Sequence, residues 1–328
     1  MIKCLSAIAA LVPLTLVSLV GGAEAQTYPS RPITMVVPFA PAGPTDIVAR
    51  VIGERFTASL KQTVVVENVA GAAGTSGAAR VARAPADGYT LLMGPMSTMS
   101  FSLAFFPNLP FHPLNDFEPV GIVASAPIVL VARTQTPGNT LAEFAAHLKA
   151  NAGKMANGNA GAGSSSHLAC VLLNSKIGVS PTIVPYRGTA PVIQDMLSGQ
   201  IDYLCDQVTS VMGQVTAGAI KPIAVMAPTR SPVLPNVQTA KEAGFEGVDM
   251  VLWNAIFAPK GTPREIVMAL NAAIGRGVDE PAAREKFQQL GAEAPPADQR
   301  SPEALARIHA RDIATWSAVI KNANITLN

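Results

Sequence analysis

Charged side chains are scarce in this sequence of 328 residues. Asp, Glu, Lys and Arg together make up 14%, against roughly 25% in ordinary soluble domains. Hydrophobic residues make up 49%, which excludes a disordered chain and is enough for a large core or two medium ones. The net charge is +2, no run of Lys or Arg occurs, and aromatic residues are only 5%. The sequence therefore argues against a nucleic-acid partner, because such surfaces need clustered positive charge or stacking aromatic rings.

The first 25 residues have the pattern of a targeting segment. Lys3 precedes an apolar stretch from about Leu5 to Val20, and Ala23-Glu24-Ala25 then offers a small-residue cleavage site. A membrane anchor is the alternative, but Pro13 interrupts the stretch. No later apolar run is long enough to span a membrane. The sequence therefore predicts a signal peptide over 1–25 that is cleaved before Gln26, and hence an exported protein.

Cysteine is also rare, and only Cys170 and Cys205 follow the predicted leader. In an oxidising compartment the two could form a disulfide. Each lies in an apolar stretch, however, and this favours two buried free thiols. The sequence does not give the distance between them.

Strands and helices alternate along the chain. Apolar runs at 33–39, 63–67 and 89–93 predict strands, and helices are expected between them from Thr45, as N-cap, and over 75–83. This order predicts a parallel sheet with helices on its faces. The same alternation returns later, with strands at 128–131, 154–157, 182–184, 201–205 and 220–226 and helices at 140–150, 165–177, 189–197 and from 209.

The C-terminal part has a different pattern. A strand at 252–257 precedes three helices that each begin at a proline, over 263–278, 281–290 and 302–321. We expect this tail to return to the first unit. The predicted domains are 26–125 with 249–328, and 126–248, joined by crossovers near 124–127 and 247–252. Such an arrangement places a ligand cleft between two α/β domains, at the carboxyl ends of strands.

Catalytic and metal-binding patterns are weak. No two of the four histidines are spaced i, i+4, and neither H-E-x-x-H nor C-x-x-C occurs. His167 and Cys170 share a predicted helix face, but two ligands do not make a zinc site. The turn Gly163-Ser164-Ser165 lacks the G-x-S-x-G pattern of a serine hydrolase. We therefore expect no catalytic residue, no metal and no cofactor.

Glycine-rich loops are the other candidates. The run from Gly71 to Gly77 is close to a dinucleotide-binding pattern, but close packing of a helix on a strand explains it better. Three other strand-to-helix loops, at 40–46, 161–167 and 187–190, are rich in Gly, Ser and Thr. Each presents free backbone N–H groups at the start of a helix, which suits a carboxylate. Taken singly, each is also compatible with an ordinary capped helix.

Several segments, among them Trp253 with APKGTP (258–263), resemble the Bug family, the TctC-like substrate-binding proteins of tripartite tricarboxylate transporters. The match runs in order over nearly the whole chain after the leader. It includes YPSRPITMVVPFAPAGPTDIVAR (28–50), VVVENVAGAAGTSGA (64–78), ARAPADGYTLLMG (82–94), SSSHLA (164–169), VPYRGTAPVIQDMLSGQID (184–202) and LPNVQTAKEAGF (234–245). The resemblance implies a type II periplasmic-binding-protein fold, with two α/β domains joined by a two-crossover hinge and a ligand between them.

The resemblance also implies a function. Such a protein is periplasmic, captures a small organic carboxylate and delivers it to the membrane subunits of the transporter; we expect a monomer. A sensor that docks on a signalling ectodomain is the alternative, and an exported hydrolase is disfavoured. The chain has Pro41-Ala42-Gly43 where the family commonly has Ala-Gly-Gly. Gly43 is expected either to adopt a positive φ or to let the ligand approach the backbone.

The expected ligand-binding residues form two walls. The first consists of Phe39, Ala40, Pro41, Ala42, Gly43, Pro44, Thr45 and Asp46, with Ser97 and Thr98. The second consists of Gly163, Ser164, Ser165, Ser166, His167, Arg187, Gly188, Thr189 and Asp206. Two roles stay open at this level: Asp206 either recognises an amino group or caps a helix, and Arg187 either pairs with a second carboxylate or covers the cleft rim.

Overall fold

The structure, a computed structural model, describes residues 28–327. This part of the chain begins with a βαβαβ unit. The predicted leader lies outside it. Strand β1 (Ile33–Val37) pairs in parallel with both β2 (Val64–Asn68) and β3 (Thr90–Pro95), as the alternation of elements predicted. Helices α1 (Pro44–Leu60) and α2 (Thr75–Ala82) connect these strands.

The two helices pack against β1 through alternate residues. Ile33 and Met35 lie in one hydrophobic cluster with Ile52 of α1, whereas Val36 lies in the other with Val81 of α2. Successive residues of a strand point to opposite faces, so a strand covered on both faces is apolar throughout. This is why the run at 33–37 carries no polar alternation.

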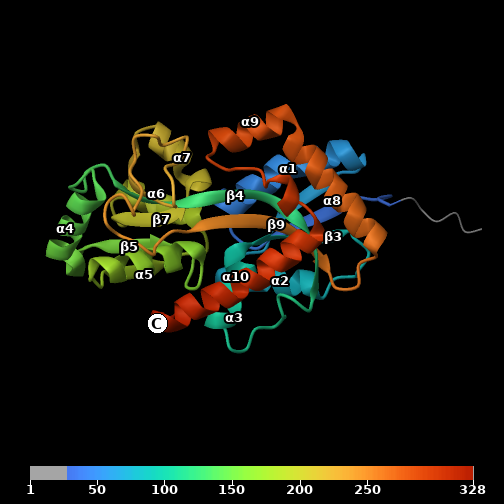
Figure 1. The fold of residues 1–328 in the computed structure, drawn as a ribbon, viewed down its shortest axis with the longest axis horizontal. Coiled ribbons are helices and arrows are strands. Elements are labelled where there is room, and N and C mark those ends of the chain that lie inside the picture. The colour runs from blue at the N-terminus through green and yellow to red at the C-terminus, as the bar shows by residue number, and fades with distance from the viewer. Residues whose placement is uncertain (1–27, 328) are drawn as a thin grey trace, which may run out of the picture.

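One long strand, β4 (Phe117–Arg133), crosses the molecule and belongs to both halves (Figure 1). Its first part pairs antiparallel with β9 (Val251–Pro259). Its last part pairs antiparallel with β7 (Tyr203–Gln207) and β8 (Ile220–Met226). The expected strand at 128–131 is therefore only the end of a much longer one.

The start of β4 was missed because its sequence argues against a strand. Pro119, Gly121 and Pro127 all lie inside it, and proline and glycine usually mark strand ends or bulges. The pairing with β9 shifts register between Pro119 and Gly121, and again between Ile122 and Ala124. These irregularities let β4 accommodate proline and glycine residues that argue against a strand in the sequence.

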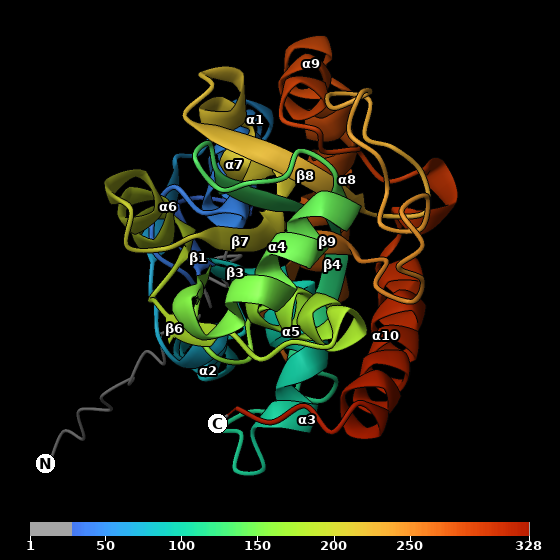
Figure 2. The same cartoon turned by 90° about the vertical axis from the view of Figure 1, so that its left-hand side faces the viewer.

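The second half repeats the α/β order. Strand β5 (Ala156–Asn159) pairs in parallel with β6 (Thr182–Pro185) and with β7. Nine strands thus form one curled sheet in the order β2-β1-β3-β9-β4-β7-β5-β6, with β8 on β4. Helices cover these strands (Figure 2). They are α4 (Leu141–Asn151), α5 (Ser165–Ile177), α6 (Thr189–Ser198) and α7 (Val208–Thr216).

The C-terminal tail returns to the first unit, as expected. Strand β9 pairs antiparallel with β3, and helices α8 (Arg264–Asp279) and α9 (Pro281–Gln289) pack on α1. Helix α10 (Pro302–Asn322) runs along one side of the molecule (Figure 2) and is fixed by a hydrogen bond of 2.8 Å from Trp253 Nε1 to Asp312. The exact division into domains stays a prediction.

Two local expectations are wrong. Cys170 of α5 and Cys205 of β7 form a disulfide, with their Cα atoms 5.4 Å apart, rather than two free thiols; the packing of α5 on β7 brings them together. The N-cap of α1 is Gly43, not Thr45, because Pro44 takes the first helical position, where a missing N–H costs nothing. Within 28–327, no helix is long and apolar enough to cross a membrane.

Candidate ligand-binding site

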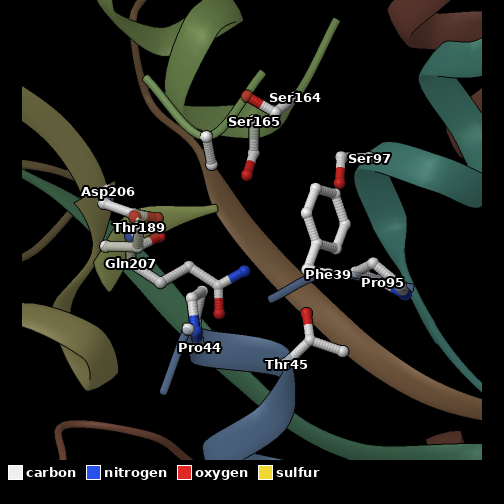
Figure 3. Close-up of a pocket in the computed structure, with 12 residues that line it drawn as sticks. Phe39, Pro44, Thr45, Pro95, Ser97, Ser164, Ser165, Thr189, Asp206 and Gln207 are labelled. Atoms are coloured by element: carbon white, nitrogen blue, oxygen red, sulfur yellow. Dashed lines mark hydrogen bonds between the residues drawn. The ribbon is translucent and has the colours of Figure 1, made fainter. Parts of the chain in front are cut away.

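A cavity lies where strands of both halves end and helices of both halves begin (Figure 3). Strands β1, β3, β5 and β7 end beside it, and α1, α5 and α6 start beside it. This is the position that the strand-to-helix loops predicted. Its lining consists of Phe39, Gly43, Pro44, Thr45, Pro95, Ser97, Ala160, Ser164, Ser165, Thr189, Asp206 and Gln207.

The loop before α1 forms the first wall. Gly43 has φ −83°, so the expected positive φ is wrong for this residue; Ala42 adopts it instead, with φ 62°. A Cβ on Gly43 would lie 3.9 Å from the Thr189 hydroxyl oxygen of the opposite wall. The backbone of this loop therefore approaches the second wall closely. Since Gly43 is the N-cap, Thr45 belongs to the first turn of the helix, and its hydroxyl points into the cavity (Figure 3).

Asp46 holds this loop in place and does not line the cavity. Its carboxylate accepts hydrogen bonds of 2.9 Å from the Ala42 N–H, from Arg50 Nε and from Asn68 Nδ2. Burial by itself would raise the pKa of Asp46, but the hydrogen bonds from Arg50, Ala42 and Asn68 outweigh it and lower the pKa. An ionised Asp46 therefore stabilises the unusual conformation of Ala42.

The loop before α5 forms part of the second wall. Ser164 is the N-cap, and its hydroxyl accepts from the His167 N–H at 3.3 Å. The hydroxyl of Ser166 accepts from the Ala160 N–H at 2.8 Å, and His167 Nδ1 accepts from the Gly163 N–H at 3.3 Å. Burial lowers the pKa of His167, which favours its neutral form. Ser166 and His167 thus shape the loop, while the Ser165 hydroxyl points into the cavity (Figure 3).

Asp206 completes this wall at the end of β7. It is 1% exposed, accepts a hydrogen bond from the Thr189 hydroxyl on one oxygen, and accepts the Gln207 N–H at 2.7 Å on the other. Burial raises the pKa of Asp206 to about 6. Asn254 Nδ2 donates to Gln207 Oε1 at 3.3 Å, so the Gln207 Nε2 group faces the cavity as a donor (Figure 3).

The lining combines neutral donors with a single carboxyl group. Hydroxyl groups of Thr45, Ser97 and Ser165 and the amide of Gln207 point into the same space (Figure 3). None of the lining residues is Lys, Arg or His. Neutral donors at helix starts can bind an anion without a formal counter-charge.

Comparison with known proteins places this cavity in a known family of proteins. Residues 48–325 match the family model described as the tripartite tricarboxylate transporter family receptor, TctC. The chain belongs to this family. Protein BugT of Bordetella pertussis is 34% identical over 305 residues, which are 93% of this chain and 93% of BugT.

Solved structures of TctC-type proteins share the fold. The periplasmic binding protein BugD is 40% identical, with a TM-score of 0.88 over 91% of this chain and 99% of BugD. MatC from Rhodopseudomonas palustris, solved with bound malate, is 41% identical, with a TM-score of 0.86 over 89% of this chain and 100% of MatC. The resemblance to the Bug family and the periplasmic-binding-protein fold are thereby confirmed.

Within this TctC chain, the structure brings nine of the expected residues around one cavity and places the others nearby. Thr98 donates to the Ala73 carbonyl at 3.0 Å, away from the cavity. Arg187 is exposed and lines a neighbouring hollow. The expected residues that do not line the cavity are Ala40, Pro41, Ala42, Asp46, Thr98, Gly163, Ser166, His167, Arg187 and Gly188.

Sequence reasoning missed three lining residues, Pro95, Ala160 and Gln207. Each lies at the last position of a strand or directly after it: Pro95 ends β3, Ala160 follows β5 and Gln207 ends β7. The rule that strand ends line the site would have found them if the strand ends had been placed correctly.

Proposed function

We propose that this chain is a periplasmic solute-binding protein that captures a small organic carboxylate and delivers it to the membrane subunits of a tripartite tricarboxylate transporter. The observation that carries this proposal is a cavity between two walls, lined by hydroxyl and amide donors at converging helix starts. Membership of the receptor family supports the role in transport, and the malate bound to MatC supports the ligand class.

The helix starts favour an anion. Helices α1, α5 and α6 begin at Gly43, Ser164 and Gly188, all beside the cavity. The first N–H groups of a helix have no partner within it, and each helix start contributes about 0.3–1 kcal/mol toward binding a negative charge. With added hydroxyl donors and no fixed cation, we expect a dissociation constant in the micromolar range, about −8 kcal/mol.

Capture requires movement of the walls. We propose that residues 26–125 with 249–328, and residues 126–248, form two domains that hinge near 124–127 and 247–252. A ligand that contacts both walls binds the closed arrangement more tightly and so shifts the population toward it. The transporter then distinguishes the loaded protein by the spacing of its domains.

A carboxylate screen tests the proposal. We expect malate, succinate, adipate or citrate to raise the melting temperature of the purified monomer in a concentration-dependent way, and calorimetry to give one site per chain. Ligand released on denaturation should be a carboxylate by mass spectrometry. Loaded protein should stimulate uptake by vesicles that hold the membrane subunits. Failure of every carboxylate to bind would contradict the proposed ligand class.

A further inference from the structure

Asp206 is a carboxyl group inside a cavity that offers it no counter-charge. Its side chain accepts hydrogen bonds from the Thr189 hydroxyl and the Gln207 N–H, which are both neutral. It is 1% exposed, and no Lys, Arg or His lines the cavity with it. A group in this setting is an unusual component of a site for anions.

Asp46 of the first wall and His167 of α5 are engaged elsewhere. Asp46 of α1 pairs with Arg50 at 2.9 Å. His167 of α5 packs its ring against Phe105. Neither Asp46 nor His167 lines the cavity, so neither compensates the charge of Asp206.

The charged groups nearer to Asp206 along the fold are also occupied or remote. Asp195 of α6 accepts from the Tyr186 hydroxyl at 2.6 Å. Arg133, at the end of β4, pairs with Asp202 at 2.6 Å, beyond the other end of β7. Arg187 is exposed at the neighbouring hollow. Helix α7 and strand β5 carry no ionisable side chain.

A carboxylate ligand would bring a second negative charge into this cavity. Two carboxylates enclosed together do not both stay ionised without a cation between them, and they share a proton instead. We propose that Asp206 is protonated when it binds the carboxylate ligand, so that each capture event takes up one proton from solvent. This inference rests on the proposed function and specifies how the same cavity accepts an anion.

Protonation of Asp206 changes which group the Thr189 hydroxyl can donate to. While Asp206 is ionised, the Thr189 hydroxyl donates to it and turns only lone pairs toward the cavity. Once Asp206 carries a proton, Asp206 donates to the Thr189 oxygen, and the Thr189 O–H is free to donate to the ligand. No covalent bond changes; one proton moves from water to a carboxylate oxygen. Because burial raises the pKa of Asp206 to about 6, a nearby anion can complete this protonation around neutral pH.

Calorimetry with malate tests the inference. Above about pH 6.5 malate is fully ionised, so any pH dependence belongs to the protein. We expect the affinity to fall by about tenfold for each unit of pH between the pKa of Asp206 in the free protein, about 6, and its higher pKa in the complex. Titrations in phosphate and in Tris, which differ in ionisation enthalpy, should give an uptake of about one proton per malate.

A variant pair assigns the proton. Asp206→Asn resembles the neutral acid, and its affinity for malate should not change with pH. Asp195→Asn is the matched control on α6, and it should keep the pH dependence and the proton uptake of the wild type. The number of protons taken up per malate is measured on the wild type, so it tests the inference even if Asp206→Asn does not fold.

The outcomes separate the two levels of the proposal. Malate binding that is independent of pH, or that strengthens as pH rises, would overturn the inference and leave the carboxylate site in place. Stronger binding of a zwitterionic amino acid with rising pH would instead assign Asp206 to an ammonium group. If malate, succinate, adipate and citrate all fail to bind at every pH, the proposed function fails, and this inference fails with it.

Discussion

Gly188 and Ala40 lie in contact beside the cavity, one from each wall. A Cβ on Gly188 would be 2.8 Å from the Cβ of Ala40, closer than two carbon atoms can approach without displacement. The backbone of Gly188 is extended, with φ 163°, so its need for glycine comes from this contact and not from its conformation. The two walls can close on each other only because this side chain is absent.

Gly188→Ala should therefore hold the walls apart. We expect a loss of ligand affinity of about tenfold or more, since displacing packed backbone typically costs 1–3 kcal/mol. Solution scattering should show a smaller ligand-induced decrease in the radius of gyration than in the wild type. The unliganded melting temperature should change little.

Two further variants test that explanation. Gly213→Ala, in α7, has no heavy atom within 4 Å of the new Cβ and should behave like the wild type. Adding Ala40→Gly to Gly188→Ala removes the clashing methyl group and should restore much of the affinity. If the double variant binds no better than Gly188→Ala, contact between these two residues does not control closure.

Ser165→Ala should weaken binding without affecting the fold. The Ser165 hydroxyl points into the cavity (Figure 3), and a hydrogen bond to a charged group contributes about 1.5–3 kcal/mol. We expect the dissociation constant measured by calorimetry to rise by at least tenfold. Ser175→Ala is the control, because Ser175 is exposed near the other end of the same helix. Equal affinities for the two variants would remove Ser165 from the site.

Asp206→Asn should stabilise the unliganded protein at high pH and not at low pH. The pKa of Asp206 is raised from 3.8 to about 6. The wild type therefore has the full benefit of a neutral Asp206 below about pH 4 and loses it as the pH rises through about 6. This shift of the pKa corresponds to a loss of about 3 kcal/mol in the free energy of unfolding of the wild type above about pH 6.

Urea denaturation at about pH 5 and about pH 8 measures this effect. The gain in the free energy of unfolding from Asp206→Asn should be larger at pH 8. A gain that is the same at both pH values would show that Asp206 does not titrate near 6 in the unliganded protein. Asp195→Asn serves again as the control, because Asp195 is only partly enclosed and bonds the Tyr186 hydroxyl.

Reduction of the Cys170–Cys205 disulfide should destabilise the half of the molecule that contains α5 and β7. The two residues are 35 positions apart, and closing a loop of that length restricts the unfolded chain by about 4 kcal/mol. We expect a clear fall in the melting temperature with dithiothreitol. The Cys170→Ala, Cys205→Ala variant should show the lower value with and without reductant. An unchanged melting temperature on reduction, with free thiols verified by mass, would contradict a stabilising role.

The sequence determined much of the local structure and the family. Helix α5 spans Ser165–Ile177 and strand β8 spans Ile220–Met226, and both were predicted with these bounds. Their signals are local: an N-cap serine with a C-terminal glycine for α5, and the apolar residues from Ile223 to Met226 for β8. The βαβαβ order likewise follows from periodicity within short windows. The family followed from ordered segments over the whole chain.

How residues far apart in the chain act on one another depends on the tertiary fold. Cys170 and Cys205 pair because α5 packs on β7, and the start of β4 becomes a strand because β9 lies beside it. Asp46 and Asp206 were similar candidates in the sequence. Arg50 neutralises Asp46 outside the cavity and Asn68 donates a hydrogen bond to it, whereas Asp206 lines the cavity with neutral partners. The charge state of a carboxyl group depends on its solvation and on nearby charges, and these are set by contacts that no local pattern contains.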